Sequence, residues 1–156
     1  MVNIAKLTKK RLGELLVNEG LLTEDQVKEA LNEQKKTGEL LGEVLVKLGY
    51  VSEMDIARTI ATQFGLPYLD ASRYYVSKDV LNVCTSEELM RYQMVPLDKI
   101  GNILIIAVSG LLNEEVFEEL EKRTSCNIHL FVSTSSQVLQ AIKTYFQQAS
   151  PAAKKP

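Results

Sequence analysis

The sequence predicts an α+β protein in which a four-helix subdomain of two helical hairpins precedes a small α/β subdomain. The strongest observation is an internal repeat, because residues 11–34 recur with substitutions as residues 40–63, and each copy has the apolar spacing of two short helices. Beyond residue 66, short aliphatic runs alternate with helical patterns, as in a small α/β layer. Of the 156 residues, 46% are apolar, which is enough to build a core in both parts.

Each copy of the repeat predicts a helical hairpin. In the first copy, three leucines at i, i+3 and i+4 form one apolar stripe on a short helix, namely Leu12, Leu15 and Leu16. Gly20 follows at the place of a left-handed residue that ends such a helix. Thr23 and Gln26 have the spacing of a capping box, so a second helix should begin at residue 24. The second copy repeats these signals at Gly49, which ends its short helix, and at Ser52, which caps the next one.

A glycine stands inside the first helix of each copy, at Gly13 and Gly42. A helical glycine costs roughly 0.5 to 1 kcal/mol relative to alanine, so a repeated one calls for a reason. It can let two helices approach closely, or it can leave room for a flat ligand against the backbone. The sequence leaves both explanations open.

Two polar residue types also recur at equivalent positions. Gln34 and Gln63 end the second helix of each copy, and their amides can both donate and accept hydrogen bonds. Glu14 and Glu43 follow the repeated glycines. We expect these two glutamates to face solvent, because they occupy a surface position of the predicted helix.

The second part of the chain predicts alternating strands and helices. Aliphatic runs predict strands over residues 94–97, 103–108 and 128–132, with a turn at Gly101 and Asn102 between the first two. Helices are predicted over residues 113–122 and from a cap formed by Thr134 and Gln137 to Phe146. The predicted organisation is a basic leader (1–10), the repeat subdomain (11–65), the α/β subdomain (66–147) and a disordered tail (148–156).

Composition disfavours several classes of function. The formal net charge is −2, whereas a nucleic-acid binder normally carries a large basic excess, so no DNA or RNA partner is expected. No apolar run has the length of a membrane span and no secretory signal stands at the start, so we expect a cytoplasmic protein without membrane insertion. Cys84, Cys126 and His129 lack the spacing of a metal site and are expected to be structural. No nucleophile-and-base pair stands out, so we expect no enzymatic activity.

The doubled motif resembles the N-terminal domain of type II secretion and type IV pilus assembly ATPases, in the MshE-like version that binds cyclic di-GMP. That family carries the signature twice with a five-residue spacer, as here. The first copy matches at Arg11, Leu12, Gly13, Leu16, Val17, Gly20, Val27, Ala30, Leu31 and Gln34. The second copy matches at Leu41, Gly42, Leu45, Val46, Gly49, Ile56, Ile60 and Gln63, and departs from the signature at Leu40 and Thr59. The resemblance continues through residues 64–146, although residues 108–113 depart from the Ala-x-x-Asp-Pro-like stretch of the family.

This resemblance implies a receptor for cyclic di-GMP that needs no other cofactor. The polar contacts implied are those of Arg11, Gln34 and Gln63. The implied apolar surface consists of Leu12, Val27, Leu31, Leu41, Ile56 and Ile60, with Gly13 and Gly42 letting the ligand touch the backbone. No GxxxxGK[ST] phosphate-binding loop occurs in the sequence, so we expect a regulatory module without the motor, either free-standing or part of a longer chain.

A second function remains open on the same residues. Similar domains dock on the inner-membrane platform protein of the secretion or pilus machinery, and this chain could do only that, without binding a nucleotide. The spacing of the aliphatic residues would also build an ordinary four-helix core.

Overall fold

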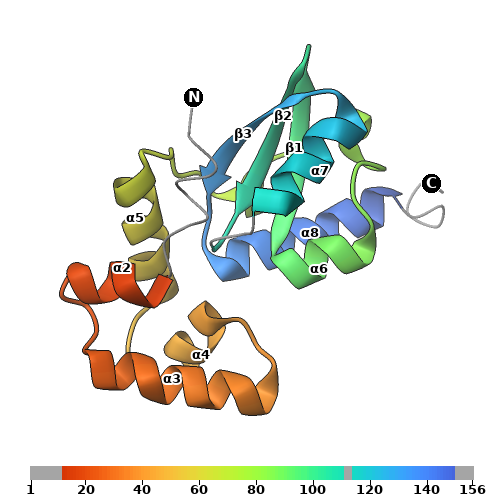
Figure 1. Cartoon of the computed structure of the whole chain (residues 1–156). Coiled ribbons are helices and arrows are strands. Elements are labelled where there is room, and N and C mark those ends of the chain that lie inside the picture. Colours follow the sequence, from red (N-terminus) through yellow and green to blue (C-terminus); the bar gives the residue numbers. More distant parts are fainter. Residues whose placement is uncertain (1–11, 111–113, 150–156) are drawn as a thin grey trace.

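The computed structural model describes residues 12–110 and 114–149. The expected basic leader, Arg11 and the expected tail from residue 150 onward lie outside these residues. Figure 1 shows a group of helices beside a mixed α/β part, which confirms the predicted fold class. The repeat forms α2 (Leu12–Asn18), α3 (Glu24–Thr37), α4 (Leu41–Lys47) and α5 (Glu53–Phe64). The α/β part contains η1 (Ala71–Arg73), η2 (Lys78–Val80), α6 (Ser86–Tyr92), β1 (Met94–Ile100), β2 (Ile103–Val108), α7 (Glu114–Thr124), β3 (Asn127–Val132) and α8 (Ser135–Ala149).

The helix ends of both copies are those that the sequence predicts. Gly20 and Gly49 take the left-handed conformation, with φ of 76° and 78°. The N–H of the residue after each glycine donates to the carbonyl oxygen five residues earlier, at 3.0 and 3.1 Å, which is the Schellman pattern. Capping boxes at Thr23 and Ser52 then start α3 and α5. These local signals give both copies the same short helix, tight turn and second helix.

The two hairpins exchange their packing partners. α2 packs on α5 and α3 packs on α4, so the first helix of each copy lies against the second helix of the other. Leu16 and its repeat counterpart Leu45 are both fully buried where these helices meet. Leu16 and Leu45, at the same repeat position, therefore pack in equivalent places in the two copies.

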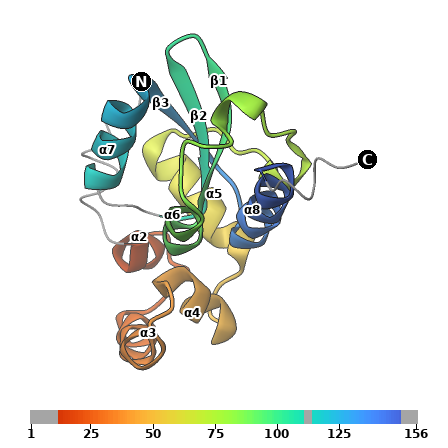
Figure 2. The same ribbon diagram turned by 90° about the vertical axis from the view of Figure 1, so that its right-hand side faces the viewer.

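The α/β part is built on a three-stranded sheet of order β1-β2-β3. β1 runs antiparallel to β2, with a register shift between Pro96 and Asp98, and β2 runs parallel to β3 through the crossover helix α7. Gly101 is left-handed, with φ of 60°, which confirms the predicted turn between β1 and β2. Figure 2 shows α7 and α8 on opposite sides of the sheet.

One hydrophobic core runs through both parts of the molecule. It joins Ile60 of α5 through Leu66 to Val132 of β3, and α5 packs against β3 directly. Because both parts share this core, the relative position of the repeat and the sheet is fixed by apolar packing. No helix within residues 12–110 and 114–149 has the length and apolar character that a bilayer crossing requires.

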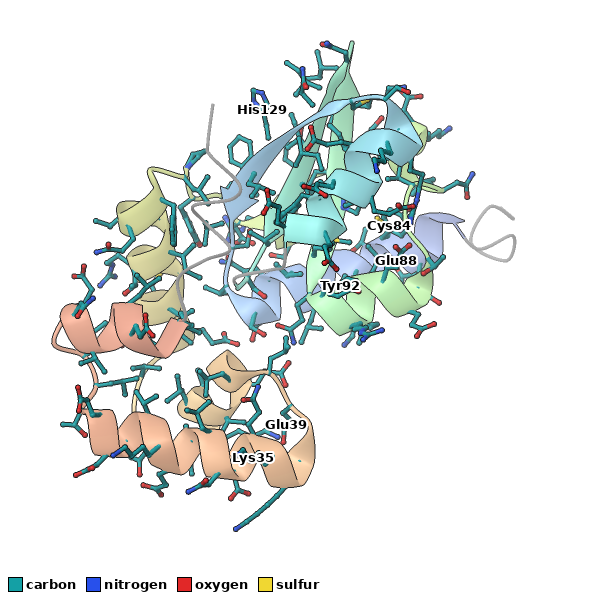
Figure 3. All side chains as sticks on the ribbon, in the orientation of Figure 1. Lys35, Glu39, Cys84, Glu88, Tyr92 and His129 are labelled. Atoms are coloured by element: carbon teal, nitrogen blue, oxygen red, sulfur yellow. The ribbon has the colours of Figure 1, made fainter. Side chains whose placement is uncertain are left out.

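Of the three residues expected to be structural, the two cysteines are buried, whereas His129 is an exposed strand residue. Cys84 and Cys126 are buried free thiols, and burial raises the pKa of Cys84 to about 12. His129 lies on β3 with its side chain exposed, on the outer side of the sheet (Figure 3).

Helix α6 is the main element that the sequence patterns do not predict. Leu89 is its one buried residue, so the helix shows no apolar stripe like that of α2, although Thr85 and Glu88 form a capping box at its start. Arg123 at the end of α7 donates to both carboxylate oxygens of Glu88, at 2.9 and 3.0 Å, and so ties α7 to α6. This pair holds the pKa of Glu88 at about 2.

Candidate ligand-binding site

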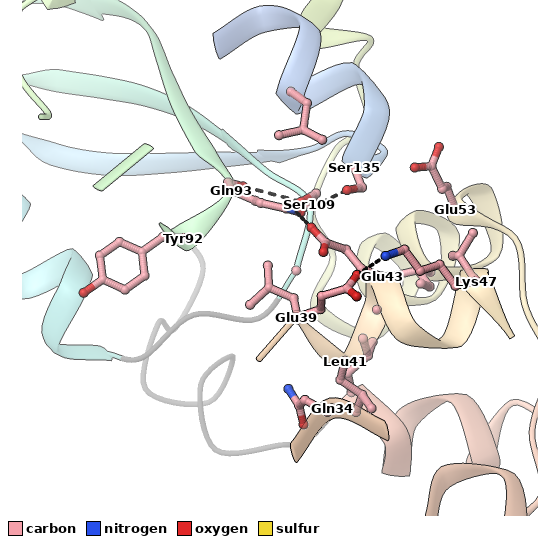
Figure 4. A pocket seen from close by; sticks show the side chains of 17 residues that line it. Gln34, Glu39, Leu41, Glu43, Lys47, Glu53, Tyr92, Gln93, Ser109 and Ser135 are labelled. Carbon is pink, nitrogen blue, oxygen red and sulfur yellow. Dashed lines mark hydrogen bonds and ion pairs between the residues drawn. The ribbon is translucent and has the colours of Figure 1, made fainter. Parts of the chain in front are cut away.

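A cavity of about 500 Å³ lies where the tandem repeat meets the α/β part. The repeat contributes the end of α3, most of α4 and the start of α5 to its wall. The opposite wall comes from Tyr92, Gln93, Ser109, Gly110, Ser135 and Leu139 (Figure 4). Its volume falls within the range of about 300 to 1,000 Å³ that is usual for small-molecule sites.

Residues expected from both copies of the motif line this cavity. They are Leu12 and Gln34 of the first copy and Leu41, Gly42 and Ile56 of the second. A Cβ placed on Gly42 would stand 3.4 Å from Cδ1 of Ile56 and 3.6 Å from Cδ2 of Leu12. Gly42 therefore forms part of an apolar wall, and a methyl group at this position would touch both Ile56 and Leu12.

The other expected site residues lie elsewhere. Gly13 packs against Val27, and a Cβ on Gly13 would stand only 2.8 Å from Cγ1 of Val27. Ile60 is fully buried in the core, and Leu31 is an exposed residue of α3 outside the cavity. Arg11 lies outside the described residues. Of the two explanations for the repeated glycines, close helix approach describes Gly13, whereas Gly42 faces the cavity.

The two repeated glutamines have different surroundings. Gln63 donates from Nε2 to Oε1 of Glu19 at 2.5 Å, outside the cavity. The residue that corresponds to Glu19 in the second copy is Leu48, which has no polar side chain. Gln34 therefore has no equivalent of that carboxylate, and it lines the cavity instead.

Gln93 links the two walls, and no sequence pattern indicated this residue. Its side-chain Nε2 donates to the carboxylate of Glu43 on α4, and its Oε1 accepts from the hydroxyls of Ser109 and Ser135, both at 3.0 Å (Figure 4). Gln93 is only 5% exposed and takes the left-handed conformation (φ 47°) that ends α6. The expectation that Glu43 faces solvent is wrong, because this contact holds it half-buried. Recognition of α6 would have placed Gln93 at a helix end.

Carboxylates dominate the charge of the cavity wall. Among the described residues that line it, the charged ones are Glu39, Glu43, Glu53 and Lys47. Glu39 and Lys47 form an ion pair at 2.5 Å, and this contact raises the pKa of Lys47. Glu53 accepts from the N–H and the hydroxyl of Ser136, at 3.2 and 2.8 Å. The cavity thus combines an apolar wall with several hydrogen-bond acceptors and one amine.

A tandem helical repeat joined across a cavity to a three-stranded α/β layer defines the class of protein, the N-terminal domains of type II secretion and type IV pilus assembly ATPases. More particularly, the chain belongs to the MshEN domain family, whose model matches residues 64–152. This match lies in the α/β part, and together with the relatives and solved structures below, which also extend over the repeat, it confirms the family resemblance.

The relatives extend the likeness over most of the chain. The type IV pilus assembly ATPase PilB of Myxococcus xanthus is 30% identical over 90% of this chain, and PilB of Thermus thermophilus is 29% identical over 94%. The chain spans 25% and 17% of the length of these two proteins.

Two solved structures share the fold. The structure of MshE with cyclic di-GMP is 32% identical, with a TM-score of 0.67 over 88% of this chain and 99% of that one. The N-terminal domain of XpsE has a TM-score of 0.65 at 21% identity, over 85% of this chain and 92% of that one, and shows likeness of fold alone.

Proposed function

We propose that this domain binds cyclic di-GMP in the cavity between the tandem repeat and the α/β layer, and that it acts as a cytoplasmic regulatory receptor for pilus or type II secretion machinery. The observation that carries the proposal is the convergence of Leu12, Gln34, Leu41, Gly42 and Ile56, from both copies of the motif, on one cavity. The likeness to MshE, whose structure was solved with this ligand, supports the choice of ligand.

The chemistry of the wall suits a guanine base. The Watson–Crick edge of guanine carries two donor groups and one acceptor, and the amide of Gln34 can serve either kind of group. The carboxylates of Glu43 and Glu53 lie in the same wall and accept hydrogen bonds. Leu12, Leu41 and Ile56 offer apolar surface to the face of the base. Contacts of roughly 1 to 3 kcal/mol each, with this burial, reach the −8 kcal/mol that a micromolar affinity requires.

Binding of the two negatively charged phosphates of cyclic di-GMP requires positively charged side chains at the site. Lys47 lines the cavity, and the family resemblance assigns a polar contact to Arg11. We expect Arg11 to bind a phosphate or a guanine edge, because its guanidinium can make two parallel hydrogen bonds with either group. The domain has a binding role in this proposal, and no catalytic step is assigned to it.

Isothermal titration calorimetry of the full chain with cyclic di-GMP tests the proposal. Gln34→Ala is expected to weaken binding by about tenfold, which corresponds to the loss of one good polar contact. Gln63→Ala is the matched control, since it removes the same amide from the equivalent position outside the cavity. Absence of saturable heat with the wild type would overturn the proposal, and equal losses in both variants would remove Gln34 from the site.

A protein-docking function is the second candidate, and the acidic wall favours it. Three carboxylates and one amine line the described part of the cavity, which disfavours a ligand with two phosphates unless Arg11 compensates. In that case the chain would bind the cytoplasmic region of a platform protein with the same affinity in the presence and absence of cyclic di-GMP. A nucleotide-dependent affinity in this measurement would favour the receptor instead.

A further inference from the structure

A second groove lies on the first copy of the repeat, away from the cavity. It has a volume of about 280 Å³, and its lining includes Gly13, Glu14, Val17, Asn18, Glu24 and Val27. We call this set the first-copy groove. It is formed between α2 and the first turn of α3.

The first-copy groove has a counterpart within the ligand cavity. The two copies are offset by 29 residues, the difference between positions 40 and 11. Adding this offset to the six lining residues gives Gly42, Glu43, Val46, Lys47, Glu53 and Ile56, all of which line the cavity. We call this second set the second-copy groove. The same face of the hairpin is therefore a groove in both copies.

The second-copy groove shows what this surface binds, because the chain covers part of it. Ser136, in the first turn of α8, donates its N–H and its hydroxyl to Glu53, at 3.2 and 2.8 Å. The amide of Gln93 donates to Glu43. Leu139, one turn further along α8, adds an apolar side chain to the same wall. Carboxylates suit this neighbour, since the start of a helix carries partial positive charge and free N–H groups.

The first-copy groove carries the same two carboxylates, and within residues 12–110 and 114–149 it forms an open pocket. Glu14 and Glu24, the counterparts of Glu43 and Glu53, are exposed in the described structure. Lys28 also lines this groove, at the position where the second copy has Ala57, which is 1% exposed. A lysine at this place suits a surface that is covered only when a partner arrives, because its long stem can lie along the groove while the amine stays in water.

We propose that the first-copy groove is the docking site for a helix of another protein. The first turn of this helix presents serine or threonine hydroxyls and free N–H groups to Glu14 and Glu24. An aliphatic side chain one turn later lies against Val17 and Val27. This inference rests on the contacts that Ser136 and Gln93 make with the carboxylates of the second-copy groove, and it does not require cyclic di-GMP binding.

An acetylated synthetic peptide of residues 133–149, which contains α8 and its cap, is a direct probe of this surface. It is titrated into the uniformly ¹⁵N-labelled full chain while backbone amide shifts are followed by NMR. We expect saturable shift changes that centre on Gly13, Glu14 and Glu24. The same peptide with Ser136→Ala should bind several-fold more weakly, because it lacks the hydroxyl that Glu53 accepts in the second-copy groove.

Two variants of the chain separate specific docking from general attraction. Glu24→Gln is expected to weaken the peptide by roughly tenfold, as expected for the loss of a charge-assisted hydrogen bond. Asp25→Asn is the matched control, since Asp25 is acidic, lies in the same first turn of α3 and does not line the groove. Equal weakening by both variants would overturn the proposal. So would unchanged shifts at the groove, or shifts confined to Gly42 and Ser135, which would mean that the peptide displaces α8 instead.

Discussion

The two repeated glycines should respond in opposite directions to replacement by alanine. A Cβ on Gly13 would stand 2.8 Å from Cγ1 of Val27, inside the normal approach of two carbons, whereas a Cβ on Gly42 would make an ordinary contact of 3.4 Å with Ile56. Val27 is branched at Cβ and has little freedom to turn that methyl away. Overpacking of this kind costs about 1 to 3 kcal/mol, against a gain in helix propensity of up to about 1 kcal/mol.

Gly13→Ala is therefore expected to lower the free energy of unfolding by about 1 kcal/mol. Gly42→Ala is expected to leave it unchanged or to raise it by up to about 1 kcal/mol. Urea unfolding followed by circular dichroism measures both, with equal slopes showing that the unfolded states are comparable. A Gly13→Ala variant as stable as the wild type would refute the argument from close helix approach.

The same pair of variants also bears on the ligand. Gly42→Ala adds a methyl group to the cavity wall and should weaken cyclic di-GMP binding in calorimetry. Gly13→Ala lies outside the cavity and should bind as the wild type does, at a temperature where both are folded. Wild-type affinity in Gly42→Ala would place the ligand away from α4.

Three further predictions follow from contacts in the structure. Ser52→Ala removes the cap of α5 and should lower the free energy of unfolding by about 1 kcal/mol in urea titrations. Arg123 is the chief cause that lowers the pKa of Glu88 from 4.5 to about 2. The pair therefore stabilises the fold above pH 4.5, and this stabilisation is lost as the pH falls toward 2. The difference in the free energy of unfolding between wild type and Arg123→Met should narrow over that interval. Burial raises the pKa of Cys84 to about 12, so its reaction with a thiol reagent at pH 8 should be far slower in the native chain than in urea, with Cys84→Ser identifying its signal.

The predictable parts of the fold are those with local causes. Gly20, Gly49 and the capping residues Thr23 and Ser52 act within a few neighbours, so their sequence signals correspond directly to helix ends. The exchange of packing partners between the hairpins has no such local cause, because it depends on contacts between helices that are far apart in the sequence. Both the exchanged and the unexchanged arrangement bury the same apolar stripes, so periodicity alone does not distinguish them.

The site was predictable in part, for a related reason. The motif identified five residues that the cavity brings together, because repeat positions mark residues with a shared role. It did not show that Gln34 and Gln63 differ, since this depends on the tertiary contact between Gln63 and Glu19 of the other copy, where Leu48 is the counterpart of Glu19. Gln93 was missed because its contacts with Glu43, Ser109 and Ser135 join segments that only the tertiary fold brings together.

The exchanged packing of the hairpins has a consequence for how such a domain arises. A single hairpin of this kind would leave both of its helices without a partner, so it would fold only as a homodimer with two identical faces. Fusion of two copies into one chain removes that identity. Glu19 and Leu48 then occupy one repeat position and give two equivalent glutamines different neighbours. After gene duplication, equivalent positions of the two copies can therefore be selected independently of each other.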